Sequence, residues 1–263
     1  MTRHSQTHDV PVATTMPARR PHTHLNRVQL LGLGAGLMLT AVPSRVSAAP
    51  ARAISGTAAT IQDILNVLVT LERFGVAVVT ANLTGKIQPR LHPLHIPIEQ
   101  ASVAAFLAQT DFWESRGGRS LTDTFTLPVP PGESTPGLQA KEQDTVLYVG
   151  AFTAAARQFA ELGQPHLATY ACQTASVHAE NRALARAVLI LEGVPHEMPP
   201  ADKAFETDLF RTVRDAYKAM SDAGLFGRLS VPVPYPTRAA VLAAAGPMAR
   251  LIVQTTPNGA AAH

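Results

Sequence analysis

Two ionisable side chains on the predicted buried faces of helices are the best candidates for chemistry in this chain. Glu72 follows Leu65 and Leu68 by seven and four residues, so it lies on the apolar stripe of its helix. An unpaired inward carboxylate is unfavourable, so Glu72 requires a metal ion, a basic partner such as an arginine of another helix, or solvent at the stripe edge. His178 lies on a second apolar stripe, and its imidazole is either a metal ligand or a core histidine.

The segment that carries His178, Gln164 to Gly193, is predicted to be one long helix. It begins near Pro165, contains no internal glycine or proline and ends at Gly193. About 28 residues at a rise of 1.5 Å give roughly 42 Å, a length typical of helical bundles. Its predicted inward face consists of Leu167, Tyr170, Ala171, Thr174, His178, Asn181, Ala185, Val188 and Leu189.

Apolar spacing predicts further helices before and after this segment. Their predicted ranges are Ala59 to Leu83, Ile98 to Ser115, Ala140 to Leu162, Ala201 to Ala223 and Arg238 to Val253. The second range places Val103, Phe106, Leu107, Thr110 and Trp113 inward, with Glu99 in its first turn, where the helix dipole favours a carboxylate. The third range places Asp144, Leu147, Ala151, Ala154, Gln158 and Leu162 on one face.

Two of the connections are rich in proline. Thr84 to Pro97 is predicted to be a loop, and His92 and His95 within it are expected at the surface. Leu121 to Gln139 is a long Pro/Gly/Ser-rich connection with a short extended piece at Thr124 to Val129. Such a connection suits a chain that crosses the end of a bundle or covers an opening.

Composition favours a single all-α domain preceded by a leader. The chain has 263 residues, few aromatic side chains and no strictly alternating stretch. Its single cysteine, Cys172, cannot form an internal disulfide and is expected to be a small buried hydrophobe, not a nucleophile. There is no phosphate-binding glycine loop after a strand, no nucleophile-elbow pattern and no His-Glu-x-x-His motif.

Residues 1–48 have the order of an export signal. A polar region with the pair Arg19-Arg20 precedes the apolar run from Val28 to Val42, and small residues follow up to Ala48. This order resembles a twin-arginine signal and predicts a periplasmic or extracellular protein that meets the membrane only through the signal. An ordinary secretory signal and an uncleaved anchor are the alternatives.

The net charge of +3 also belongs to this leader. The leader holds five arginines and one acidic residue, which leaves 17 basic and 18 acidic residues in the remainder. The remaining charge of about −1 gives no support to nucleic-acid binding.

The order of helices and loops resembles the ferritin-like superfamily, and most closely its exported members grouped with plant desiccation-related proteins. The similarity covers roughly residues 58–225 and leaves residues 226–263 as a C-terminal extension with a short helix. The segments that carry it are DILNVLVTLERFGVAVVTANL, AAFL, FTLP, TASVHAENRALARAVLILEGVP and KAFETDLFRTVRDAY. The resemblance implies an all-α, ferritin-like four-helix bundle with a long loop between its second and third helices and extra C-terminal helices.

Metal-binding members of that superfamily take an inward Glu from two helices and a Glu-x-x-His pair from the other two. Carried over by position, Glu72 falls on the first-helix glutamate, and the fourth-helix pair falls on His178 and Asn181. In the second helix the pair falls near Gln100 and Val103, which are not acidic; Glu99 is one position off. The nearest acids of the third helix are Glu142 and Asp144.

The resemblance therefore implies a reduced ligand set of Glu72, Asp144 and His178. These three could hold one Zn²⁺, Mn²⁺ or Fe²⁺, or they could form a metal-free polar core. The first hypothesis is an exported, stress- or desiccation-related structural or binding protein with no complete dimetal centre. The alternative is an iron- or manganese-binding oxidoreductase or iron-handling protein.

A third hypothesis is a partner-binding bundle that uses the 121–139 loop and the 201–223 helix. Homo-oligomers are compatible with all three hypotheses.

Overall fold

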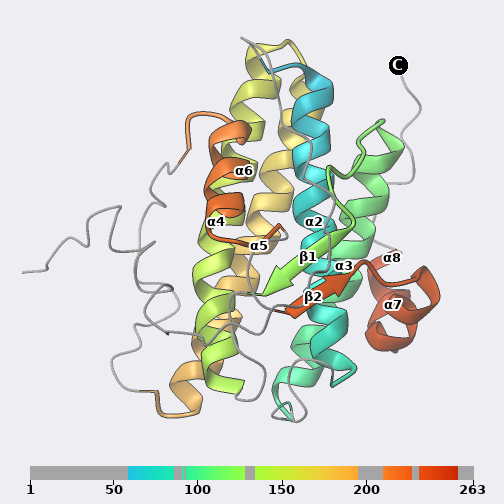
Figure 1. The fold of residues 1–263 in the computed structure, drawn as a ribbon, viewed down its shortest axis with the longest axis vertical. Helices are drawn as coiled ribbons and strands as arrows, with labels where there is room; N and C mark the ends of the chain where they lie inside the picture. The colour runs from blue at the N-terminus through green and yellow to red at the C-terminus, as the bar shows by residue number, and fades with distance from the viewer. Residues whose placement is uncertain are drawn as a thin grey trace, which may run out of the picture. The chain divides into compact units, whose positions relative to one another are not determined.

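Four long helices form the framework of the protein in the computed structural model (Figure 1). They are α2 (Ile61–Leu83), α3 (His95–Ser115), α4 (Ser134–Glu161) and α5 (Pro165–Leu191). The structure describes residues 59–85, 91, 93–127, 134–194, 210–226 and 231–253. These residues are predominantly helical, which confirms the all-α prediction. The predicted export signal, residues 1–48, and His92 lie outside the described residues.

Local sequence signals fix the ends of these helices. Thr60 caps α2, accepting from the Asp63 amide while the Asp63 carboxylate accepts from the Thr60 amide, which is a capping box. Pro165 opens α5, where its missing N–H is not needed. Gly163 has a φ of 70°, and this left-handed residue allows the tight turn from α4 into α5.

Contacts along the helices establish their relative directions. Gln62 lies near the start of α2, and its side-chain Nε2 donates to the Gly117 carbonyl just after the end of α3. Helices α2 and α3 are therefore antiparallel. Along α3, Glu99 contacts Lys141 and Trp113 stacks on Phe159, so α3 and α4 run parallel. The short turn between α4 and α5 makes that pair antiparallel. The chain must therefore travel back along the helices between α3 and α4.

One strand of a short two-stranded sheet lies on this return path (Figure 1). β1 (Thr124–Leu127) pairs antiparallel with β2 (Val231–Pro234), with Phe125 opposite Val233. β1 confirms the extended piece predicted from Thr124. No strand is predicted from the sequence at β2, in which proline occupies alternate positions. Proline removes the ladder donor but is tolerated in an edge strand, and the described part of this sheet has only edge strands.

The C-terminal residues pack onto the same framework. α6 (Val213–Asp222) contacts α2 and α4, and α7 (Arg238–Ala245) and α8 (Met248–Val253) contact α3. The predicted 201–223 helix starts only at Val213 within the described residues, because Thr212 caps it; residues 201–209 are not described. The single helix predicted from Arg238 to Val253 is interrupted at Gly246, which has a φ of 55°.

Several sequence predictions about surface and core are wrong. His95 is not a loop residue at the surface: it is the first residue of α3 and is 2% exposed. The helix starts early because Pro97 lies in its first turn, where no amide donor is required. Cys172 is exposed, since Ala171 and Ala175 occupy the buried face of α5. Leu162 is exposed because it follows the last residue of α4.

The predicted inward faces are otherwise largely buried. Part of the core between the long helices is aromatic, and it contains Trp113 packed on Phe152 and Phe159. Among the described helices, α2 alone is long and apolar enough to cross a membrane by length and composition. Its apolar side chains are covered by the protein itself, as expected for a core helix.

Candidate functional site

A buried carboxylate–imidazole pair lies at the centre of the long helices. His178 Nε2 of α5 is 3.0 Å from Glu72 Oε1 of α2, and the two side chains are 1% and 0% exposed. The amphipathic pattern of each helix places these residues inward. Helices α2 and α5 do not pack directly on each other, so the two side chains meet across the interior of the bundle. Glu72 therefore has a histidine partner, and not the arginine that the sequence left open.

Aromatic rings surround the imidazole. The ring centroids of Phe106, Tyr148 and Phe152 lie 5.3, 4.7 and 5.1 Å from that of His178. The Tyr148 hydroxyl donates to the Leu71 carbonyl at 2.7 Å, so its polar end is satisfied. The pair is therefore enclosed in an environment of low dielectric constant, where each polar contact is strong and each unpaired atom is costly.

Burial and the histidine act in opposite directions on Glu72. Burial raises the pKa of the Glu72 carboxyl, and the charge and hydrogen bond of His178 lower it by a smaller amount, so the pKa stays raised. Glu72 Oε2 has no hydrogen-bond partner among the described residues. The carboxyl thus keeps one buried oxygen that a further donor or a cation could contact.

Asp144 lies on α4 one turn before Tyr148 and is only partly buried. Loss of solvation raises the pKa of Asp144 to about 7. Within the described ranges, no three His, Cys, Asp or Glu side chains form a group that could hold a metal ion. The structure therefore brings Glu72 and His178 together but does not add Asp144 to them as a third ligand in such a group. Metal binding by these three residues stays a prediction.

Two other acidic residues of the interior contact cations of the chain. Lys141 Nζ is 2.7 Å from Glu99 Oε1, and Arg182 Nε is 2.9 Å from Glu142 Oε1. Arg186 also contacts Glu142. Burial favours a higher pKa for Glu142, but the hydrogen bonds and charges of Arg186 and Arg182 outweigh it and leave the pKa lowered. The sequence explains Glu99 only by the helix dipole, which favours a carboxylate in the first turn of a helix. It does not predict the ion pairs of Glu99 and Glu142.

Little in the sequence indicates that Lys141, Arg182 and Arg186 are the partners of these carboxylates. Arg182 and Arg186 are four residues apart, so they share a side of α5, but nothing in that spacing identifies a partner on α4. Lys141 directly precedes Glu142, and only the tertiary packing shows that its ammonium points to α3.

Two further polar contacts connect α3 to α5 and its C-cap residue Glu192. Ser102 Oγ donates to Asn181 Oδ1 at 3.1 Å, and His95 Nε2 lies 3.1 Å from Glu192 Oε1. Asn181 occupies the position where the resemblance expects a histidine ligand. Its amide instead bonds a neighbouring helix, so it contributes to packing.

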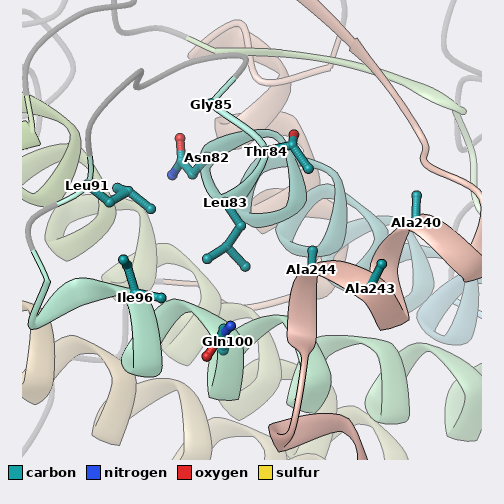
Figure 2. Close-up of a pocket in the computed structure, with 10 residues that line it drawn as sticks. All are labelled: Asn82, Leu83, Thr84, Gly85, Leu91, Ile96, Gln100, Ala240, Ala243 and Ala244. Carbon is teal, nitrogen blue, oxygen red and sulfur yellow. The ribbon is translucent and has the colours of Figure 1, made fainter.

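A surface pocket of about 600 Å³ lies apart from these polar pairs (Figure 2). It is formed where the end of α2, the first turns of α3 and helix α7 meet. Asn82, Ile96, Gln100 and Ala243 are among its lining residues, and all the described residues that line it are uncharged. Glu72, Asp144 and His178 do not line this pocket.

Comparisons with protein-family models, with curated proteins and with solved structures found no match for this chain.

Proposed function

We propose that this chain is an exported ferritin-like helical bundle with a structural or binding role in stress or desiccation, and that it lacks a complete dimetal centre. The directions of the helices support the ferritin-like part. Because α3 and α4 run parallel, the bundle needs one long return connection, which is the connectivity of ferritin-like folds. The C-terminal helices α6, α7 and α8 match the expected extra helices.

The proposal that the protein lacks a complete dimetal centre depends on one observation. Three acidic side chains between the long helices contact other side chains of the protein. A dimetal carboxylate centre takes about six ligands, four of them carboxylates. Here Glu72 bonds His178, Glu99 bonds Lys141, and Glu142 bonds two arginines. The described residues therefore do not fit a dimetal centre, because a side chain of the protein already contacts one oxygen of each of these carboxylates.

The arrangement supports a packing role for the polar interior. Each pair connects two different helices, so it fixes their register in the way that buried polar groups specify one packing. A bundle held in this way suits a stable structural or binding protein. We therefore infer no catalytic reaction.

Metal analysis of the wild-type protein tests this proposal. Protein purified from its native compartment is expected to contain much less than one iron or manganese ion per chain. The matched control is the variant Glu72→Gln, which removes the carboxylate charge and should have the same low metal content. Two iron or manganese ions per wild-type chain, lost in the variant, would show that the proposal is wrong.

The alternative is a metal-binding protein that uses Glu72, His178 and Asp144. The observation in its favour is Glu72 Oε2, which is buried and has no hydrogen-bond partner among the described residues. A titration of the metal-free protein with Mn²⁺ or Zn²⁺ distinguishes the two functions. Saturable binding that the variant Asp144→Asn weakens would support this alternative, since carboxylates are ligands for both ions.

A further inference from the structure

Lys141 places an ammonium group between α3, α4 and α5. Its Nζ lies 2.7 Å from Glu99 Oε1 and 3.5 Å from Ser102 Oγ. The Lys141 side chain is 16% exposed and that of Glu99 is 5% exposed, so this ion pair is largely withdrawn from solvent. A charge in such a position requires compensation nearby, and Glu99 supplies it.

The groups around this ammonium are mostly oxygen atoms. A carboxylate oxygen of Glu99 and the hydroxyl oxygen of Ser102, both from α3, face the ammonium, and Ser102 Oγ itself donates to Asn181 Oδ1 of α5. Glu99 Oε2 is buried and has no hydrogen-bond partner among the residues that the structure describes. Oxygen atoms of this kind, with one carboxylate, are the usual ligands of a small cation.

The space beside the pair leaves no room for a free ion. A narrow void lined by His95, Ile98, Glu99, Lys141, Ala185 and Val188 does not admit a water molecule. The ammonium of Lys141 therefore takes the place that a bound cation would need. Lys141 and the apolar side chains of Ile98, Ala185 and Val188 line this same void.

We infer that Glu99 and Ser102 form a cation site whose ligand is the chain's own Lys141, and that a primary alkylammonium ion binds there when this side chain is removed. An alkylammonium reproduces both parts of the lysine, since its N–H donors meet the oxygens and its carbon chain replaces the aliphatic stem. The inference goes beyond the proposed function, because it holds whether or not Glu72 and His178 bind a metal.

The test uses the variant Lys141→Ala and propylammonium chloride. Propylammonium has three carbon atoms and an ammonium group, which are the heavy atoms that the truncation removes. The variant is expected to unfold at a temperature lower by roughly 5–10 °C, because Glu99 loses its partner. Propylammonium should restore at least half of this loss with a saturable dependence on concentration, as expected for a ligand of the folded state.

Two controls separate binding from general effects. Lys218→Ala removes an exposed lysine that pairs with Asp222, and its unfolding temperature should not respond to propylammonium. Tetramethylammonium has no N–H donor and should not rescue Lys141→Ala. Absence of saturable rescue, or an equal response of Lys218→Ala, would overturn the inference. Binding of Mn²⁺ by Lys141→Ala without any binding of propylammonium would also overturn it.

A second pair of variants covers the case in which Lys141→Ala does not fold. Lys141→Met keeps most of the stem and removes the charge, so it should be destabilised. Adding Glu99→Gln removes the unpaired carboxylate and should recover most of that loss. Wild-type stability of Lys141→Met alone would contradict the inference. The metal content of the wild-type protein tests the proposed function separately, so the two failures are distinguishable.

Discussion

At the residue scale, the Glu72–His178 pair behaves as a unit. Both groups are buried, so the loss of one leaves the other without its partner in a medium of low dielectric constant. The rings of Phe106, Tyr148 and Phe152 surround the imidazole. The cost of breaking the pair therefore exceeds the cost of replacing both members together.

The variant Glu72→Ala is expected to lower the free energy of unfolding by about 3–5 kcal/mol, because it also leaves a cavity. The double variant Glu72→Leu/His178→Leu should lose much less, since no buried polar atom of the pair remains. Urea unfolding followed by circular dichroism measures both. Equal losses in the single and double variants would contradict the idea that the two side chains act as a unit.

The raised pKa of Asp144 predicts that the stability of the protein depends on pH. Its folded-state pKa is raised from 3.8 to about 7, so between these values the folded chain binds this proton more tightly than the unfolded chain. The stabilisation is present at low pH and is lost as the pH rises through this window. The slope contributed by Asp144 is at most about 1.4 kcal/mol per pH unit.

Comparison with Asp144→Asn isolates this contribution. The difference in unfolding free energy between wild type and variant should change between pH 4.5 and pH 7.5, with the wild type losing stability relative to the variant. A constant difference across that range would show that the carboxyl does not titrate within it. Denaturant unfolding at several pH values provides the measurement.

At the element scale, α2 and the end of α3 approach each other closely at Gly118. A Cβ atom at this position would lie 2.6 Å from Val69 Cγ2 and 3.0 Å from the Leu65 carbonyl oxygen. The backbone oxygen cannot move without shifting the helix, so even one methyl group is too large. The contact sets how the turn after α3 packs onto α2.

The variant Gly118→Ala is therefore expected to lower the free energy of unfolding by roughly 1–3 kcal/mol. The matched control is Gly163→Asn in the turn between α4 and α5. A side chain there meets open space, and asparagine tolerates the left-handed backbone, so this change should lose less than about 1 kcal/mol. A smaller loss for Gly118→Ala than for the control would contradict the packing argument. Thermal and urea unfolding measure the free energy of unfolding of the wild type and the two variants.

At the scale of the whole molecule, the segment that contains Tyr235 and Arg238 contacts the first two long helices, α2 and α3. Arg238 makes two bonds of 2.7 Å to the Asp111 carboxylate of α3. The Arg73 guanidinium of α2 lies 3.9 Å from the centre of the Tyr235 ring and 3.1 Å from Asp123 before β1. Tyr235 thus connects the β2–α7 segment to the long helices.

The variant Tyr235→Ala should loosen this segment without unfolding the long helices, because it removes the ring on which Arg73 stacks. Hydrogen exchange is expected to become faster at the amides of α7 and β2, whereas the amides of α5 keep their protection. Glu180→Ala, an exposed change on α5, serves as the control. Uniform acceleration across all helices would show that Tyr235 supports global stability instead.

The sequence by itself determined the long helices and which side chains lie inward on them. Three-and-four apolar spacing, Pro165 and Gly193 are local signals, so α2 and α5 were predicted to within a few residues, and so were Glu72 and His178 as inward residues. Spacing within one helix says nothing about which helix lies opposite. Only the tertiary structure paired Glu72 with His178 and Glu99 with Lys141, joined β1 to β2, and turned Cys172 outward and His95 inward, because each of these depends on contacts between residues far apart in the chain.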